Sequence, residues 1–324
     1  MSAPLLSVEA LSVAFGPPGR RLAAVADVSF ELAAGEVLAI VGESGSGKSA
    51  SAMALARLNE GPAAALGGRI TLSGRDVLSM RPAQLRALRG QGVAMVFQDA
   101  SAALNPCETV GDQIAEAIVV HGTAGWRAAR ARAVELLAEV GLPEPARRAR
   151  LYPHELSGGQ RQRAMIALAL ACDPALLIAD EPTTALDVTI QAQILGLLTR
   201  LVADRRMGMI LITHDLGVVA GVADRVAVIY AGRIVETAPV EALFARPRHP
   251  YTRDLIAAAS PAPDASGRLA SIPGAPPGLG ARPPGCAYAP RCASATERCR
   301  THRPALEPMG PGRAACWHPV GGGP

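Results

Sequence analysis

Hydrophobic and polar positions along the first 260 residues follow two periods, one typical of strands and one typical of helices. Residues 5–15 and 25–32 alternate as strands do, whereas residues 37–41 form a continuous apolar run of the buried-strand type. Further strands are expected at residues 93–97, 176–179 and 209–213, with a hairpin over 226–236. Helices are expected at residues 49–58, 156–171, 190–203 and 250–259. Strands separated by helices predict an α/β fold.

The pattern of apolar and polar residues changes at two places along the sequence. From about residue 100 to residue 160 the periodicity is helical, which predicts a helical subdomain. After Ser260 the chain becomes rich in proline, glycine and arginine and loses its periodicity. We therefore expect two domains, residues 1–260 and residues 261–324, with the second irregular and held by something other than a hydrophobic core.

One lysine, Lys48, occurs in the whole chain, although lysine and arginine together number 32. It lies in a string that fits the phosphate-binding loop pattern G-x-x-x-x-G-K-[ST], formed by Gly42, Glu43, Ser44, Gly45, Ser46, Gly47, Lys48 and Ser49. An expected buried strand precedes the string and an expected helix follows it, as the motif requires. Backbone N–H groups of such a loop point at phosphates, Lys48 would reach the β- and γ-phosphates, and Ser49 would ligate Mg²⁺. The sequence therefore predicts a nucleotide-phosphate site.

Two acidic residues directly follow the apolar run at 176–179. Asp180 is expected to hold Mg²⁺, directly or through water. Glu181 is a candidate general base for the attacking water. An acidic turn at a strand end is common by itself, so both assignments depend on the phosphate loop upstream.

Residues 156–163 read Leu-Ser-Gly-Gly-Gln-Arg-Gln-Arg and form the most specific string in the chain. Two glycines at a helix start are costly unless the backbone must approach a ligand closely and present N–H groups to an anion. The string, with Ser157, Gly158, Gly159 and Gln160 at its centre, resembles the signature of ATP-binding cassette (ABC) proteins. The resemblance implies the fold of an ABC nucleotide-binding domain, with a RecA-like core sheet, an N-terminal antiparallel β region and an inserted helical subdomain.

The resemblance also gives roles to residues that are weak signals alone. Gln98 is similar to the glutamine that senses the γ-phosphate, takes part in the Mg²⁺ site and contacts the transmembrane partner. His214 is similar to the switch histidine that contacts the γ-phosphate. Asp187, in the string Ala185-Leu186-Asp187, resembles the loop that links the two nucleotide sites of a dimer, and Phe15 resembles the aromatic that stacks on adenine. The order Lys48, Gln98, Ser157, Asp180, Glu181 and His214 along the chain resembles that of the family throughout.

Two cassettes facing head to tail are implied by the resemblance. Each ATP then binds between the phosphate loop that contains Lys48 in one subunit and the signature that contains Ser157 in the other. ATP closes the pair, and hydrolysis with release reopens it, so this chain alone is expected to be a poor ATPase. The expected partners are a second ATPase subunit, with a paralogue favoured, two transmembrane permeases, and an external binding protein that acts through them.

Several strings are most similar to ATP-binding subunits of the oligopeptide/dipeptide import type, namely residues 98–111, 179–195 and 247–252. Ala100 departs from this pattern, since a proline is usual there. Import of oligopeptides or dipeptides is the leading interpretation, and import of nickel or glutathione by the same branch stays open. A soluble cassette acting in DNA repair or on ribosomes and an exporter subunit are both disfavoured by the single set of motifs and by these strings.

Four of the six cysteines lie in the last 39 residues, namely Cys286, Cys292, Cys299 and Cys316. In a cytosolic chain such a cluster indicates a metal site more often than disulfides. The spacing contains none of the C-x₂₋₄-C pairs that zinc ribbons favour. Four thiolates are the usual complement of a [4Fe–4S] cluster. The resemblance implies the same, since some members of this branch look to carry such a cluster here. We expect this cluster, with zinc and free thiols or a disulfide as alternatives.

The formal charge of +4 is mild and shows no concentrated basic stripe, so no nucleic-acid partner is expected. The N-terminus lacks the features of a signal peptide. No apolar run approaches the roughly 20 residues that span a bilayer. We expect a peripheral protein on the cytoplasmic face of the inner (plasma) membrane, held there by its partners.

Overall fold

The computed structural model describes residues 3–122, 124–184, 186–259 and 271–321. The chain forms two compact units that alternate along the sequence. The first unit comprises Met1–Leu5, Leu32–Glu36 and Leu72–Leu211, and the second comprises Leu6–Glu31, Val37–Thr71 and Ile212–Pro324. The predicted boundary falls on residues 260–270, outside the described residues, and stays a prediction.

The first unit combines strands in the order β8-β7-β6 with a series of helices. Its elements in chain order are β5 (Arg75–Asp76), α2 (Pro82–Gln91), β6 (Val93–Val96), α3 (Ala100–Ala103), α4 (Val110–Val120), α5 (Trp126–Glu139), α6 (Pro145–Arg148), the 3₁₀ turn η1 (Pro153–Glu155), α7 (Gly158–Ala169), β7 (Leu176–Asp180), α8 (Val188–Arg205) and β8 (Gly208–Ile212). Strands β6 and β7 are parallel, with Val93 opposite Leu176 and Val96 opposite Ala179. Every residue of β7 is buried, as the apolar run at residues 176–179 predicts, and the buried Asp180 ends the strand.

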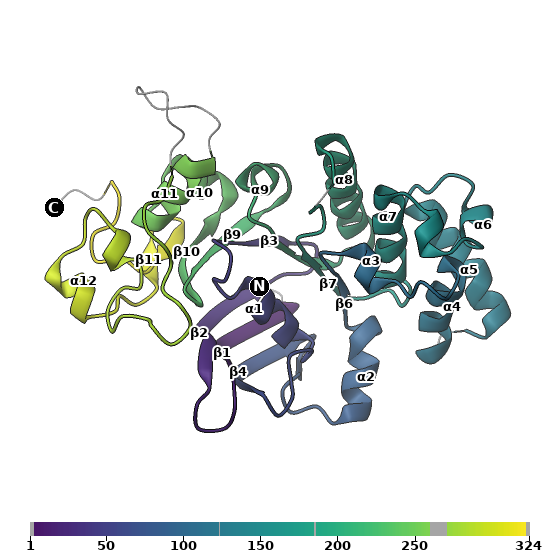
Figure 1. Cartoon of the computed structure of the whole chain (residues 1–324), viewed down its shortest axis with the longest axis horizontal. Coiled ribbons are helices and arrows are strands. Elements are labelled where there is room, and N and C mark those ends of the chain that lie inside the picture. The colour runs from purple at the N-terminus through teal and green to yellow at the C-terminus, as the bar shows by residue number, and fades with distance from the viewer. Residues whose placement is uncertain (1–2, 123, 185, 260–270, 322–324) are drawn as a thin grey trace. The chain divides into compact units, whose positions relative to one another are not determined.

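Helices α4 to α7 gather beside one another in Figure 1 and confirm the predicted helical region. Side-chain caps set the starts of α4 and α7. Thr109 accepts the Asp112 N–H ahead of α4, and Ser157 accepts the Gln160 N–H ahead of α7. Among the described residues, the structure contains no helix with the length and apolar character needed to cross a membrane.

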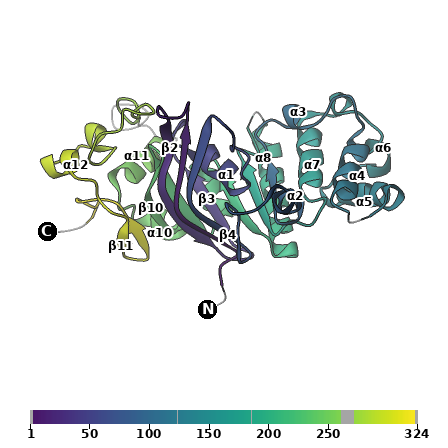
Figure 2. The same cartoon turned by 90° about the horizontal axis from the view of Figure 1, so that it is seen from below.

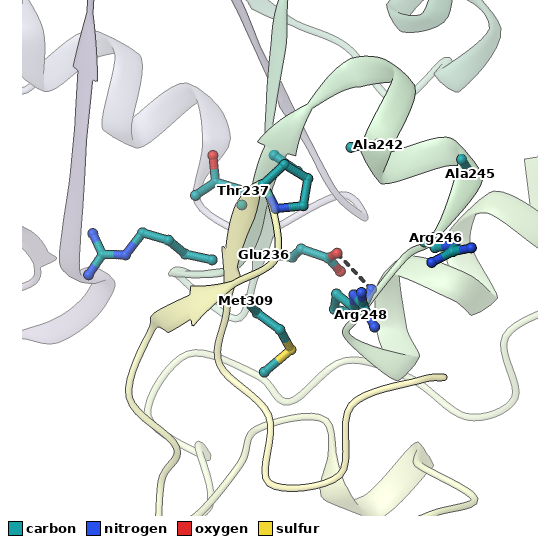
Figure 3. A pocket seen from close by; sticks show the side chains of 11 residues that line it. Glu236, Thr237, Ala242, Ala245, Arg246, Arg248 and Met309 are labelled. Atoms are coloured by element: carbon teal, nitrogen blue, oxygen red, sulfur yellow. Dashed lines mark hydrogen bonds between the residues drawn. The ribbon is translucent and has the colours of Figure 1, made fainter. Parts of the chain in front are cut away.

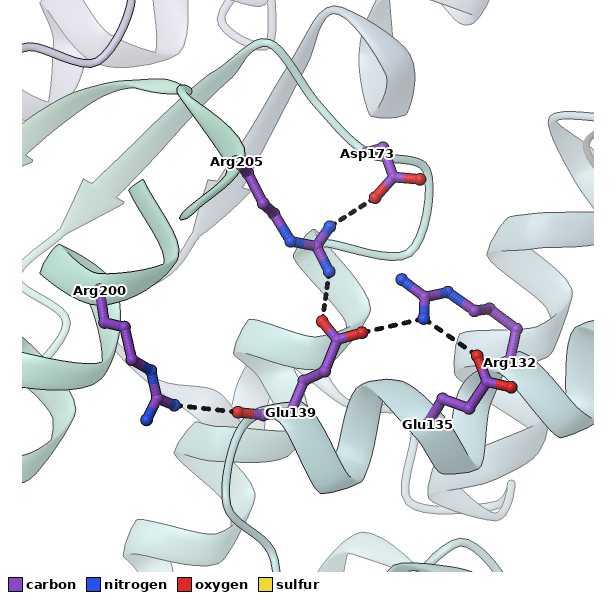
Figure 4. A network of polar contacts seen from close by, with 6 residues as sticks. All are labelled: Arg132, Glu135, Glu139, Asp173, Arg200 and Arg205. Carbon is purple, nitrogen blue, oxygen red and sulfur yellow. Dashed lines mark hydrogen bonds and ion pairs between the residues drawn. The ribbon is translucent and has the colours of Figure 1, made fainter. Parts of the chain in front are cut away.

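A network of charged side chains ties α5 to α8 within this unit (Figure 4). The Glu139 carboxylate accepts hydrogen bonds from Arg132, at 2.9 Å, and from Arg205. Arg205 also pairs with Asp173, and Arg200 donates to the Glu139 carbonyl at 3.1 Å. Burial opposes ionisation of Glu139, but the hydrogen bonds and charges of Arg205 and Arg132 outweigh burial and lower its pKa below the ordinary value.

The second unit holds a small sheet, a second set of paired strands and the tail. Its elements in chain order are β1 (Leu6–Phe15), β2 (Leu22–Leu32), β3 (Val37–Val41), α1 (Lys48–Leu55), β4 (Ala64–Leu72), α9 (Leu216–Val222), β9 (Arg225–Tyr230), β10 (Arg233–Pro239), α10 (Val240–Ala245), α11 (Pro250–Ala259), the 3₁₀ turn η2 (Ala289–Arg291), α12 (Glu297–Thr301), β11 (Glu307–Met309) and β12 (Gly312–Ala314). Strands β2, β1 and β4 lie side by side in that order (Figure 1), and Figure 2 shows the same strands from below. Strand β3 is fully buried and runs parallel to β9, and β9 and β10 form the predicted hairpin.

The tail is more regular than the sequence predicts. Strand β12 pairs antiparallel with β10, placing Ala314 opposite Glu236, and β11 pairs with β12. Tyr288 is fully buried and packs its ring against Tyr230 and Tyr251, each with a centroid distance of 5.3 Å. The expectation of an irregular tail without apolar burial is therefore wrong in part. Strands of three residues are too short to show a period, and β10, with which β12 pairs, lies far away in the sequence.

A cavity of about 160 Å³ lies where β10, α10 and the β11–β12 turn meet (Figure 3). The buried Glu236 carboxylate at its edge accepts the backbone N–H groups of Arg248, at 2.7 Å, and His249, at 2.8 Å. Burial raises the pKa of Glu236 although these N–H groups favour the ionised form. Glu236 thus anchors the segment that leads from α10 into α11.

Candidate functional site

The phosphate loop connects β3 to α1 in the second unit, as the motif predicts. Gly47 precedes α1 with a φ of +102°, a conformation that favours glycine. At Gly42, with a φ of +153°, a Cβ would lie 2.1 Å from the Ile229 carbonyl oxygen. Both positions therefore require glycine, and the loop is shaped by its backbone.

Lys48 and Ser46 place polar groups inside this loop. Lys48 is 6% exposed, and its Nζ donates to the carbonyl oxygens of Gly42, at 2.8 Å, and Glu43, at 3.0 Å. The Ser46 hydroxyl oxygen is buried and has no hydrogen-bond partner among the described residues. A buried hydroxyl without a partner is costly, so these groups fit a loop that encloses phosphate oxygens.

Glu43 fixes the loop to the C-terminal region of the same unit. Its carboxylate accepts two hydrogen bonds from Arg291, at 2.6 and 3.0 Å, and its N–H donates to the Tyr251 hydroxyl at 2.9 Å. The Arg291 side chain is 4% exposed and also bonds Tyr230. The Glu43 bonds raise the pKa of Arg291 above its ordinary value despite burial. The second residue of the phosphate loop is thus held from two sides.

The second unit also carries Phe15 and His214. Phe15 is the last residue of β1 and is half-buried, so part of its ring is accessible. His214 follows β8 and is exposed. Its neighbours fix the backbone there, because Thr213 Oγ1 accepts the Asp215 N–H at 3.0 Å and Asp215 caps α9.

Asp180, Glu181 and Gln98 meet at one edge of the sheet in the first unit. The parallel register of β6 and β7 brings the segment after Val96 beside the end of β7. Gln98 Nε2 donates to Glu181 Oε2 at 3.1 Å, and Thr184 Oγ1 donates to the same oxygen at 3.0 Å. Glu181 has a φ of +47°, an uncommon conformation that is often found at functional sites. Two side chains therefore orient this carboxylate.

The predicted signature residues, Ser157 to Gln160, and Asp187 line one cavity of about 580 Å³ in the first unit. Ser157 and Gln160 form a reciprocal capping box at the start of α7. Asp187 caps α8 by accepting the Ile190 N–H at 2.9 Å. Two helix N-termini thus border the cavity, which suits an anion. Ala185 lies outside the described residues.

Three supporting residues have no counterpart among the sequence-based assignments. Tyr251 and Arg291 hold Glu43, and Gln162, which is 4% exposed, donates to the Pro182 carbonyl next to Glu181. Tyr251 belongs to a string noted only for its resemblance, and Gln162 belongs to the signature. Arg291 has no local signal, since it lies 248 residues from Glu43 along the chain.

The four tail cysteines converge on one pocket of about 10 Å³, which also touches His249 and His318. Burial raises the pKa of Cys286 and Cys292, and it raises the pKa of Cys316 to about 11. No cysteine of this group is in a disulfide. In the part of the chain that the structure describes, no three His, Cys, Asp or Glu side chains are arranged to hold a metal ion. The thiols thus share one pocket without forming a ligand shell for a single ion.

Comparison with known proteins agrees with these features. The family model described as "ABC transporter" matches residues 25–184, and the model described as "Oligopeptide/dipeptide transporter, C-terminal region" matches residues 235–299. The dipeptide transport ATP-binding protein of Escherichia coli (strain K12) is 49% identical over 317 residues, which cover 98% of this chain and 97% of that protein. A Brucella abortus (strain 2308) ATP-binding protein named for peptide import is 50% identical over 314 residues, which cover 97% of this chain and 94% of that protein.

Among solved structures, a dimeric ATP-binding cassette in a post-hydrolysis state, bound to ADP and Pi, aligns with a TM-score of 0.64 and 27% identity. The alignment covers 72% of this chain and 98% of that one. It confirms the predicted α/β fold of an ABC nucleotide-binding domain. The phosphate loop, the signature and the match of the C-terminal region together show that the chain belongs to the ABC transporter family, among the ATP-binding subunits of oligopeptide/dipeptide type.

Proposed function

We propose that this chain is the ATP-hydrolysing subunit that powers import of oligopeptides or dipeptides through a membrane-embedded ABC transporter. The observation that carries this proposal is the near full-length identity to a dipeptide transport ATP-binding protein, which extends through the C-terminal region. The well-formed phosphate loop and the oriented Glu181 carboxylate support ATP chemistry.

Each predicted residue has a role in this proposal. The phosphate-loop N–H groups and Lys48 bind the β- and γ-phosphates, and Phe15 stacks on adenine. Ser49, Asp180 and Gln98 hold Mg²⁺, whose charge would stabilise the phosphate oxygens. Glu181 takes the proton of the attacking water, and His214 contacts the γ-phosphate.

The second half of each site comes from a partner cassette. A related cassette is dimeric with ADP and Pi bound, and the cavity at Ser157 and Asp187 suits the far side of a nucleotide. The partner is a second ATPase subunit, with a paralogue favoured, and the pair docks on two permeases at the cytoplasmic face of the membrane. An external binding protein acts through those permeases.

The imported solute is a peptide in this proposal, because the similar proteins are named for dipeptide and peptide import. Import of nickel or glutathione by the same machinery is the second candidate. Solute-dependent ATP hydrolysis by the assembled transporter separates them, since a dipeptide should stimulate turnover and nickel or glutathione should not.

The cysteine pocket is proposed to hold a [4Fe–4S] cluster, with zinc as the alternative. Four thiols that line one pocket match a [4Fe–4S] cluster in number and type, although no three of the described side chains there are arranged to hold a single ion. The cluster would be bound by four thiolates, those of Cys286, Cys292, Cys299 and Cys316. It would cross-link the tail and would add electron-transfer chemistry. Anaerobic purification and analysis should give about four irons with matching sulfide. One zinc without sulfide would overturn the cluster.

Two variants test the ATPase assignment. Glu181→Gln should leave ATP binding intact and slow hydrolysis by the assembled complex roughly 10²–10⁴-fold, the range for a general base. Lys48→Ala should lose nucleotide affinity. Glu144→Gln, which alters a surface carboxylate paired with Arg147, is the matched control and should change neither. Near-normal turnover of Glu181→Gln would remove Glu181 from the proposed role.

A further inference from the structure

A second, larger cavity in the second unit is lined mainly by cationic side chains. Its volume is about 380 Å³, within the range of small-molecule sites. Strand β10 contributes Arg233, and the tail contributes Arg282, Arg303 and Arg313. The carboxylate of Asp27, on β2, also faces it. The lining thus has four guanidinium groups against one carboxylate.

The contacts of these arginines leave much of their hydrogen-bonding capacity available. Arg233 lies 3.4 Å from Asp27, Arg282 donates to the Ala24 carbonyl at 2.9 Å, and Arg313 donates to the Leu306 carbonyl at 2.9 Å. A guanidinium carries several N–H donors in a planar fork. One such contact therefore leaves further donors that can reach a ligand.

The cations also repel one another. Burial lowers the pKa of Arg233, and the positive charges of Arg303 and Arg282 lower it further, while Asp27 offsets only part of the effect. Burial lowers the pKa of Arg282 as well. An anion placed among these groups would relieve both the repulsion and the loss of hydration.

A buried histidine at the cavity provides an independent observation. His249 is 1% exposed, and its Nδ1 accepts the Tyr251 N–H at 3.0 Å, so the neutral ring carries its hydrogen on Nε2. Among the described residues Nε2 has no hydrogen-bond partner. His249 lines both this cavity and the cysteine pocket, so this buried donor without an acceptor lies at the border of the two.

Apolar walls complete the site. Pro283, Pro284 and Leu306 line the same cavity, so a ligand there meets flat apolar surface as well as charge. We propose that this cavity binds a small soluble molecule that bears two or more phosphate groups, separate from the ATP of the phosphate loop. One phosphate would occupy only some of these forks, whereas two can engage arginines from both β10 and the tail.

The position of the cavity connects it to the phosphate loop. Tyr230, which lines the cavity, bonds Arg291, the partner of Glu43. The Gly232 N–H, in the turn between Tyr230 and Arg233, donates to the Ser46 carbonyl at 2.7 Å. A ligand that orders this turn should change ATP affinity, and ATP should change the affinity of that ligand by the same factor.

Calorimetric titration of the full chain with inorganic pyrophosphate tests the site. The chain carries Lys48→Ala, so that binding at the phosphate loop is suppressed. We expect saturable binding that weakens about tenfold or more when Arg303→Ala and Arg313→Ala are added together, because two charge-assisted contacts are lost. Both residues are exposed, and Arg303→Gln alone is the reserve variant if the pair impairs folding.

Arg300→Ala is the matched control, since Arg300 pairs with Glu297 on α12 and does not line the cavity. It should leave pyrophosphate binding unchanged. Equal binding with and without Arg303 and Arg313 would overturn the proposal. Binding to phosphatidylglycerol vesicles without binding to pyrophosphate would also overturn it, because the anion would then be a membrane surface. ATP binding by the unaltered chain, measured in parallel, keeps this outcome separate from the ATPase assignment.

Discussion

Arg291 and Glu43 form a bidentate ion pair that joins the C-terminal region to the phosphate loop. The pair is mostly buried, and Arg291 also lies 5.9 Å from the Tyr230 ring centroid and 5.7 Å from that of Tyr288. Cys292 follows Arg291 directly, so the cysteine pocket and the phosphate loop share one short segment of chain. Contacts from the tail therefore fix Glu43 in the phosphate loop.

This pair predicts that the tail sets nucleotide affinity. Arg291→Ala should raise the Kd for ATP about tenfold, because it leaves the half-buried Glu43 carboxylate without its partner and frees the loop. Arg291→Lys keeps the charge but loses the fork and should recover only part of the affinity. Equilibrium binding of a fluorescent ATP analogue measures both.

A double-mutant cycle separates this contact from general damage. In a Glu43→Gln background, Arg291→Ala should have a much smaller effect on the Kd, since the ion pair is already broken. Arg298→Ala is the control, because Arg298 packs on the Trp317 ring at 3.6 Å within the same region. An unchanged Kd for Arg291→Ala would exclude a positioning role.

Gln98 is predicted to orient Glu181 for hydrolysis. Gln98→Ala removes the 3.1 Å hydrogen bond to Glu181 Oε2 and should slow ATP turnover of the assembled transporter roughly tenfold, with ATP binding by the chain unchanged. Thr184→Val removes the other donor to the same oxygen and should have a similar effect. Wild-type turnover in both variants would show that the carboxylate needs neither contact.

Sequence reasoning predicts the fold and proposes most of the candidate site residues because their signals are local. The glycine loop, the strand that ends at Asp180 and the helix start at Ser157 each lie within about ten residues of chain, where periodicity and capping rules apply. The roles of Arg291 and Tyr251 could not be predicted in this way, because both depend on contacts with Glu43, which lies more than 200 positions away in the sequence. Strands β11 and β12 could not be predicted either, because a strand of three residues is too short to show an alternation of apolar and polar positions.

The Glu139 network predicts a pH dependence of stability. A carboxylate whose pKa falls on folding contributes stability above its unfolded pKa, about 4.3, and loses that contribution as pH falls through the folded value. Glu139→Gln should therefore lower the urea midpoint at pH 7, and the difference from the unaltered chain should shrink below about pH 4. Glu135→Gln, which alters a more exposed partner of Arg132, should show a smaller change. A pH-independent difference would indicate lost packing.

Gly47 should tolerate no side chain, because two separate constraints act on it. Its φ of +102° is strained for any other residue, and a Cβ there would lie 2.9 Å from the Ala24 carbonyl oxygen. Gly47→Ala should weaken ATP binding by tenfold or more, since relief of the clash must move the backbone N–H groups that face the phosphates. Gly61→Ala is the matched control, because Gly61 has an ordinary φ and a Cβ at that position would meet nothing within 4 Å. Circular dichroism should show both variants folded. Equal ATP affinity for the two variants would mean that the loop adapts to a side chain at Gly47 and that its backbone geometry is not what holds the nucleotide.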